Sequence, residues 1–146
     1  MELTFKYAER RDTALILKFI KELAEYEKML DEVVASEELL EDWIFNKQKA
    51  EVIFALADGK EVGFALFFHN FSTFLGRAGI YLEDLYVNPE YRGCGIGKAL
   101  LKKLGCLLWN GAAEGWNGGA WIGTNPVLIF TVLWERSLWR TGRFTG

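Results

Sequence analysis

The sequence predicts a single α/β domain in which helices flank a β-sheet. Apolar residues recur at helical spacing from Ile16 to Leu23, and they alternate in two runs on either side of Asp58-Gly59, as in a hairpin. A strand, a glycine loop and a helix then follow one another from Ile80 to Leu101. A chain of 146 residues suffices for one core, since at this length roughly two thirds of the unfolded chain's surface becomes buried.

The first elements are a short strand and an amphipathic helix. Leu3 to Tyr7 is β-like, and Asp12 or Thr13 can cap the helix, which we expect to end near Met29. Its last turn, Glu25 to Glu27, places acidic groups where a helix C-terminus is already negative, so the local field favours a cation. A solvated acidic face would give the same pattern.

A second helix and a hairpin come next. Ser36 caps the helix, and we expect its buried side to carry Leu39, Leu40, Trp43 and Ile44. The residues 52–56 and 62–66 alternate in hydrophobicity around the tight turn at Asp58-Gly59, which predicts an antiparallel hairpin. The stretch from Phe71 to Arg77 is expected to be a loop.

The central stretch reads IYLEDLYVNPEYRGCGIGKALL, a strand that ends at Asn88-Pro89, a loop with three alternate glycines and a helix from Lys98. Such a loop lets backbone N–H groups converge on a phosphate at the positive end of the helix. The dinucleotide fingerprint G-x-G-x-x-G fails because Lys98 replaces its third glycine. The nucleotide loop G-x-x-x-x-G-K-S/T fails at Arg92 and Ala99.

What remains, R-G-x-G-x-G after Glu83-Asp84, resembles the acetyl-CoA-binding motif of the GNAT N-acetyltransferases. Arg92, Gly95 and Gly97 occupy its fixed positions. More narrowly, YLEDLYV followed by EYRGCGIGKALL looks like the diamine and polyamine enzymes, the spermidine/spermine and thialysine branch. The resemblance covers roughly Leu3 to Leu104 and implies a mixed, mostly antiparallel sheet that opens beside its fourth strand to admit the cofactor.

The resemblance implies an acetyl-CoA-dependent N-acetyltransferase acting on a primary amine of a small diamine, polyamine or lysine-like substrate. An alkyl amine has a pKa of about 10.4 and must lose a proton before it attacks, so a base is needed. Glu83 can act directly or through a water if burial raises its pKa; it could instead pair with Arg92 or a backbone N–H. The resemblance favours the base.

Further site residues follow from the same resemblance. The cofactor-binding set is Leu85, Tyr86, Val87, Arg92, Gly93, Cys94, Gly95, Ile96, Gly97 and Lys98. Within it, the strand end offers an N–H to the thioester oxygen, the loop amides and Arg92 hold the pyrophosphate, and Cys94 has no nucleophilic role. Tyr26 and Glu27 are implied as substrate contacts, and Asp84 is a second contact for the cation if the strand bulges.

Composition restricts the partners. A net charge of -3 and a pI near 5.3 argue against nucleic acid and suit a cationic small substrate. Two cysteines form no disulfide framework, and neither a signal peptide nor an apolar run of membrane length is found, so we expect a cytoplasmic protein that does not bind membranes. The lone His69 suggests a structural role and no metal site. The resemblance implies a homodimer formed through the C-terminal strands.

The tail after Leu104 differs from the rest. Residues 105–146 hold five charged residues but five of the six Trp and eight of the fifteen Gly. The C-terminal segment typical of the family, with an Asn and an F-Y pair on a last helix, does not appear here. If each codon is instead read from the third base of one codon and the first two of the next, suitable synonymous codons give a sequence that resembles this segment, including W-N-x-P-S and D-F-Y-R-S-L-G. We therefore interpret 1–104 as the acetyl-CoA-binding core and 105–146 as the frame-shifted remainder of the same domain.

Three alternatives remain. The tail could be a genuine Gly- and Trp-rich extension with a strand from Val127 to Trp134. The enzyme could acetylate another amine, such as an amino acid or a protein N-terminus. If the tail is genuine and lacks the tyrosine that usually protonates the departing thiolate, the chain could be a non-catalytic acyl-CoA-binding domain.

Overall fold

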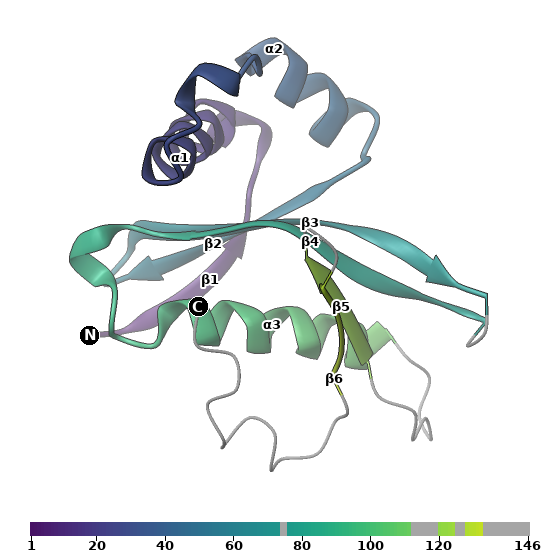
Figure 1. Ribbon diagram of the computed structural model, residues 1–146. Helices are drawn as coiled ribbons and strands as arrows, with labels where there is room; N and C mark the ends of the chain where they lie inside the picture. The colour runs from purple at the N-terminus through teal and green to yellow at the C-terminus, as the bar shows by residue number, and fades with distance from the viewer. Residues whose placement is uncertain (74–75, 112–119, 125–127, 133–146) are drawn as a thin grey trace.

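The computed structural model describes residues 1–73, 76–111, 120–124 and 128–132. Its sheet has the order β1-β2-β3-β4-β5-β6, with strands Leu3–Tyr7, Glu51–Ala57, Lys60–Ser72, Arg77–Val87, Ala120–Thr124 and Leu128–Val132. The helices are α1 (Thr13–Tyr26), α2 (Glu37–Leu40) and α3 (Ile96–Gly111). Helices α1 and α2 cover one face of the sheet and α3 the other, giving three layers (Figure 1).

The sheet is mixed but mostly antiparallel, as expected. Of the strand pairs in the described part of the chain, only β4–β5 is parallel, and it joins Ile80, Tyr81 and Leu82 to Ile122, Gly123 and Thr124. Among the described residues, β4 therefore has no strand partner on this side beyond Leu82. Within the described residues, the backbone of Glu83 to Val87 is unpaired on this side, which agrees with the opening beside the fourth strand that the family resemblance implied.

Aromatic packing fixes α1 to the sheet. Phe19 is 2% exposed, and its ring lies 5.6 Å from that of Phe64, 5.9 Å from that of Tyr86 and 6.0 Å from that of Phe54. Such ring pairs add about 0.5–1.5 kcal/mol each beyond the burial of their area. This cluster holds the middle of α1 against the sheet, next to Tyr86 near the end of β4.

The opposite face is packed by α3. Ile96, Leu100 and Leu104 recur at helical spacing, are almost fully buried and contact the apolar side of β4, including Leu82. The apolar side chains of β2 and β3 complete this second core. The N-terminus of α3 is thereby fixed next to the end of β4.

The predicted β2–β3 hairpin is confirmed. Asp58 and Gly59 both have positive φ, 49° and 82°, which a two-residue turn of this kind requires. The next hairpin is longer than predicted. Phe71 and Ser72, which we expected in a loop, pair with Ala78 and Arg77 as parts of β3 and β4.

Both long helices differ from prediction by a few residues. Helix α1 ends at Tyr26 and not near Met29, because Lys28 adopts a left-handed φ of 59° and the Met29 N–H donates back to the Ala24 carbonyl. Helix α3 begins at Ile96, two residues before Lys98. Periodicity alone does not resolve such ends.

The expected buried side of the second helix is half wrong. The Ser36 Oγ accepts from the Leu39 N–H, as predicted for a cap. Ile44 is 7% exposed, but Leu39 and Trp43 are each 49% exposed. The helix continues after α2 as a π-helical turn, Glu41–Asn46, and Leu40 and Ile44 are on the side that packs against the core, whereas Leu39 and Trp43 are on the other side.

Two short strands lie in the tail. β5 was not predicted, whereas β6 falls within the strand expected from Val127 to Trp134 if the tail is genuine. Val127 and residues 133–134 lie outside the described part, as do the positions 112–119.

Candidate functional site

The loop after β4 is shaped to present backbone amides. Gly93 and Gly95 have φ values of 81° and 79°, in the left-handed region that residues with a Cβ disfavour. The Ala99 N–H donates to the Gly95 carbonyl at 3.0 Å, so the first turn of α3 starts directly after this glycine. The N–H groups of that first turn have no partner within the helix, which makes them suited to bind an anion.

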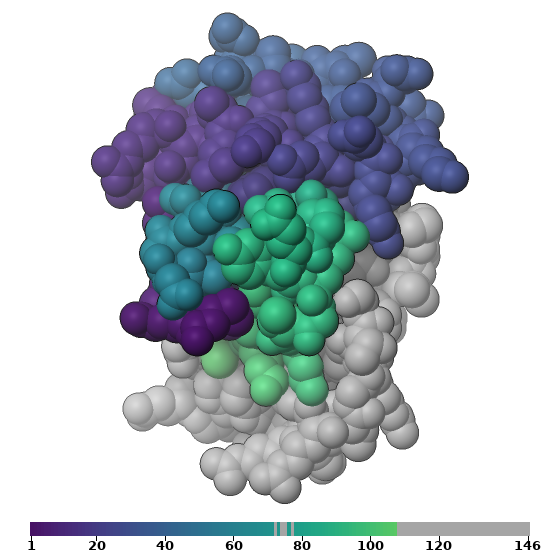
Figure 2. Space-filling view, turned by 90° about the vertical axis from the view of Figure 1, so that its left-hand side faces the viewer, coloured from purple at the N-terminus to yellow at the C-terminus, as the bar shows by residue number. Residues whose placement is uncertain are grey.

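A cleft of about 490 Å³ lies over this loop. Its lining is Leu23, Tyr26, Leu85, Tyr86, Val87, Tyr91, Arg92, Gly93, Gly95, Ile96, Gly97 and Lys98. All predicted cofactor residues except Cys94 therefore line one cleft, while Cys94 is exposed beside it. Figure 2 views this end of the molecule, with the loop region in green beneath the helical layer.

Arg92 is held from three sides. Its Nε donates to the Val87 carbonyl at 3.0 Å. Its guanidinium carbon lies 4.4 Å from the centre of the Tyr26 ring and 5.6 Å from that of Tyr86. Among the described side chains, Glu83 does not pair with Arg92, which was one alternative to its role as the base.

β4 bulges at Glu83. Asp84 pairs with Leu66 and Leu82 with the next residue of β3, Phe67, so that Glu83 is an extra residue on β4. Tyr86, two residues after Asp84 on the same face of the strand, belongs to the core that packs against α1. The condition that we set for Asp84 as a second contact for the cation, a bulged strand, is met, but Asp84 is not among the residues that line the cleft over the loop.

The two carboxylates of the bulge differ in environment. Glu83 is exposed, whereas Asp84 is largely shielded. Burial raises the pKa of Asp84 from its ordinary 3.8 to about 6, and the negative charges of Glu83 and then Glu27 add to the rise. Burial, which we made a condition for Glu83 to act as the base, is thus found at its neighbour Asp84 and not at Glu83.

The two predicted substrate contacts at the end of α1 lie in different parts of the site. Glu27, at the C-terminal end of α1, is close enough to Asp84 to raise its pKa, so Glu27, Glu83 and Asp84 form an acidic cluster. Tyr26 lies against Arg92 on the cofactor side. Helix end and strand bulge together concentrate negative charge beside the cleft.

Sequence reasoning missed some neighbours of the site. Leu23 and Tyr91 line the cleft. Burial raises the pKa of the Tyr86 hydroxyl, and a hydrogen bond with Glu22 raises it further. Glu22 and Leu23 lie one helical turn before Tyr26, and this spacing could have predicted that they share a face of α1 with it.

His69 lies away from the cleft. Its Nδ1 is 3.2 Å from the Gly79 carbonyl and its Nε2 is 3.1 Å from a Glu51 carboxylate oxygen, contacts between neighbouring strands. The described residues contain no group of three or more His, Cys, Asp or Glu able to hold a metal ion. In the same part of the chain, no helix is long and apolar enough to cross a membrane.

A glycine loop at a helix N-terminus, beside a bulged strand, can bind an anionic cofactor and is the arrangement expected of an acyl-CoA-dependent acyltransferase. The acetyltransferase (GNAT) family model matches residues 16–104. The chain belongs to this family and is an acetyl-CoA-dependent N-acetyltransferase.

Two enzymes of similar sequence and one solved structure show what this chain resembles. The chain is 39% identical to a thialysine N-epsilon-acetyltransferase of Sus scrofa over 155 aligned positions, which cover 95% of this chain and 90% of the relative. It is 33% identical to the enzyme of that name from Caenorhabditis elegans, with 90% and 84% covered. An aminoglycoside acetyltransferase from a soil metagenomic sample shares the fold, with a TM-score of 0.67 at 18% identity and coverage of 86% and 78%.

Proposed function

We propose that this enzyme transfers acetyl from acetyl-CoA to a primary amine of a small diamine, polyamine or lysine-like substrate. The observation that carries the proposal is the acidic cluster of Glu27, Glu83 and Asp84 next to the loop cleft. A substrate with a second positive charge would relieve the repulsion within this cluster. The names of the thialysine acetyltransferase relatives support the same substrate class.

In the proposed complex, the pyrophosphate of acetyl-CoA binds at Arg92 and at the amides from Gly93 to Lys98. This region combines a cation, left-handed glycines and the positive end of α3. The thioester extends along the open edge of β4, where an N–H of Leu85, Tyr86 or Val87 would donate to its carbonyl oxygen.

The reaction is a direct attack within a ternary complex. The ammonium group of the substrate first gives a proton to a carboxylate, directly or through a water, and the neutral amine then attacks the thioester carbonyl. The C–N bond forms and the C–S bond breaks; the attacking nitrogen loses its second proton to give the neutral amide, and the CoA thiolate takes up a proton. We assign the base to Glu83, whose exposed carboxylate can reach a water, and the binding of the substrate's cation to Asp84 and Glu27.

Glu83→Gln and Asp84→Asn test these roles. We expect Glu83→Gln to lower kcat by about 100-fold or more while the Kd for acetyl-CoA is retained. Asp84→Asn should mainly raise the KM for the amine. Glu37→Gln, an exposed carboxylate on α2, serves as the matched control and should change neither value. An unchanged kcat in Glu83→Gln would remove this residue from the role of base.

We propose that the coding frame changes between about Leu104 and Trp109. The change in composition after Leu104 supports this, and the family-model match ends at the same residue, while the alignment with the Sus scrofa relative covers 95% of the chain and so continues beyond it. The shifted frame would supply the tyrosine of D-F-Y-R-S-L-G as the group that protonates the thiolate. Intact mass and peptide sequencing of protein expressed from the natural gene decide the matter. A mass of 16.7 kDa with peptides across Trp116 to Trp121 would overturn the proposal.

The resemblance also leads us to propose a cytoplasmic homodimer. β6 is the outermost described strand on its side of the sheet, and a paired edge would avoid an exposed row of backbone hydrogen-bonding groups. Sedimentation velocity over a range of concentrations tests the dimer, and a monomer at every concentration would contradict it.

A further inference from the structure

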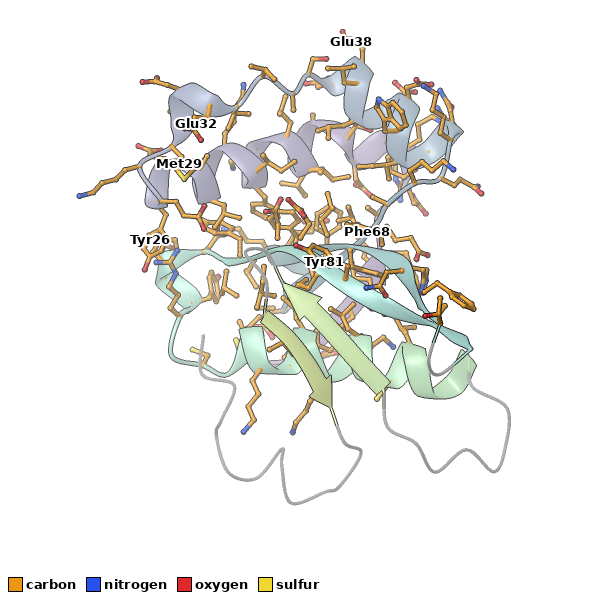
Figure 3. All side chains as sticks on the ribbon, turned by 45° about the vertical axis from the view of Figure 1, so that its right-hand side comes forward. Tyr26, Met29, Glu32, Glu38, Phe68 and Tyr81 are labelled. Atoms are coloured by element: carbon orange, nitrogen blue, oxygen red, sulfur yellow. The ribbon has the colours of Figure 1, made fainter. Side chains whose placement is uncertain are left out.

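Tyr26 contacts the cofactor side of the site. From the C-terminal end of α1 it extends toward the sheet edge where β4 ends, as Figure 3 shows. Its ring centre is 4.4 Å from the guanidinium carbon of Arg92, although 66 positions separate the two residues. The contact therefore joins the first helix to the loop that follows β4.

This ring does not serve the core. Tyr26 is 67% exposed and belongs to neither buried cluster, in contrast to Phe19 two turns earlier on the same helix. The ring lies over a cation and lines the cleft. Loss of the ring should therefore leave the packing of α1 intact.

Arg92 needs its guanidinium held in place in order to bind a phosphate through two parallel hydrogen bonds. The Nε bond to the Val87 carbonyl fixes one edge of the group, and the Tyr26 and Tyr86 rings restrict its face. No other hydrogen bond engages the guanidinium among the described residues. An arginine oriented in this way loses less rotational freedom when a diphosphate binds.

We propose that Tyr26 is a positioning residue for the cofactor: its ring orients Arg92 for the diphosphate of acetyl-CoA. The proposal rests on the proposed binding of acetyl-CoA in this cleft. It separates the two adjacent residues at the end of α1, since Tyr26 acts on the cofactor and Glu27 belongs to the acidic cluster that receives the amine. The end of one helix thus contributes to both substrate sites.

The test compares Tyr26→Leu with Tyr26→Phe. Calorimetric titration with acetyl-CoA, without amine, gives the Kd, and steady-state kinetics give kcat and both KM values. Tyr26→Leu should raise the acetyl-CoA Kd and KM by about two- to fivefold, the range expected for an exposed cation–π contact, and leave kcat and the amine KM unchanged. Tyr26→Phe keeps the ring and should bind like the wild type.

A matched control and a double variant complete the design. Tyr7→Leu removes an exposed tyrosine outside the cleft and should leave the acetyl-CoA Kd unchanged. In an Arg92→Ala background, Tyr26→Leu should weaken binding no further, because the ring has lost the group that it orients.

Other results would overturn the inference. A raised amine KM with an unchanged acetyl-CoA Kd in Tyr26→Leu would place Tyr26 in the amine site. An equal loss in Tyr26→Phe would assign the effect to the hydroxyl group. Wild-type protein that fails to bind acetyl-CoA would refute the proposed cofactor site itself, whereas normal wild-type binding that Tyr26→Leu leaves unchanged would refute only the role of the ring.

Discussion

Replacing Asp84 by Asn should stabilise the folded enzyme in a pH-dependent way. The folded structure raises the pKa of this carboxyl from 3.8 to about 6, chiefly through burial. At about 1.4 kcal/mol for each pH unit, the ionised carboxylate costs the folded state about 3 kcal/mol at neutral pH. The asparagine variant carries no such charge.

The sign follows from proton binding. Because the folded protein holds the proton of Asp84 more tightly than the unfolded chain does, this group makes the protein less stable as the pH rises from about 4 to about 6. Above that range the full cost applies. The gain in Asp84→Asn should therefore approach about 3 kcal/mol at pH 7.5 and be about half as large at pH 5.

Urea unfolding at pH 5 and pH 7.5, followed by circular dichroism, measures both gains. Asp31→Asn, which changes an exposed aspartate, is the control and should show little difference at either pH. If Asp84→Asn is no more stable than the wild type at pH 7.5, or if its gain is the same at both pH values, the argument from burial and charge is wrong.

Three further substitutions test the backbone and the core. Gly95→Ala should cost about 1–2 kcal/mol at the left-handed φ of 79° and weaken acetyl-CoA binding, measured by thermal unfolding and titration. Gly63→Ala would place a Cβ 2.6 Å from the Tyr86 carbonyl oxygen, so we expect a loss of about 1–3 kcal/mol in urea unfolding, and a neutral result would contradict this crowding. Phe19→Ala should lower the unfolding free energy by about 3–5 kcal/mol, because its ring is 2% exposed among three others.

Local patterns were sufficient for much of the scaffold. The Asp58-Gly59 turn and the loop glycines at 93 and 95 were predictable because few residue types, chiefly Gly, Asn and Asp, adopt the positive φ that these positions require. The exposure of Leu39 and Trp43 was not predictable, since hydrophobic spacing does not say which of two neighbouring rows of a helix packs against the sheet.

The site was predictable as a set of residues but not as an arrangement. The family resemblance gave the cofactor residues, Leu85 to Val87 and Arg92 to Lys98, and all of these but Cys94 line one cleft. The shielding of Asp84 and the placement of Tyr26 on Arg92 depend on how α1 docks over β4. Such contacts join distant parts of the chain, and no local pattern encodes them.

The bulge at Glu83 also determines which face of the sheet each later side chain of β4 points to. Leu82 and Leu85 pack into the same α3-side core although they stand three positions apart, a spacing that a regular strand would send to opposite faces. Deleting the one extra residue would move every later side chain of β4 to the opposite face of the sheet, so that Leu85 and Val87 would face α1 and Tyr86 would face α3. Insertions and deletions at this point of the chain therefore exchange the side chains that face α1 with those that face α3, so the length of the segment is constrained as strictly as its chemistry.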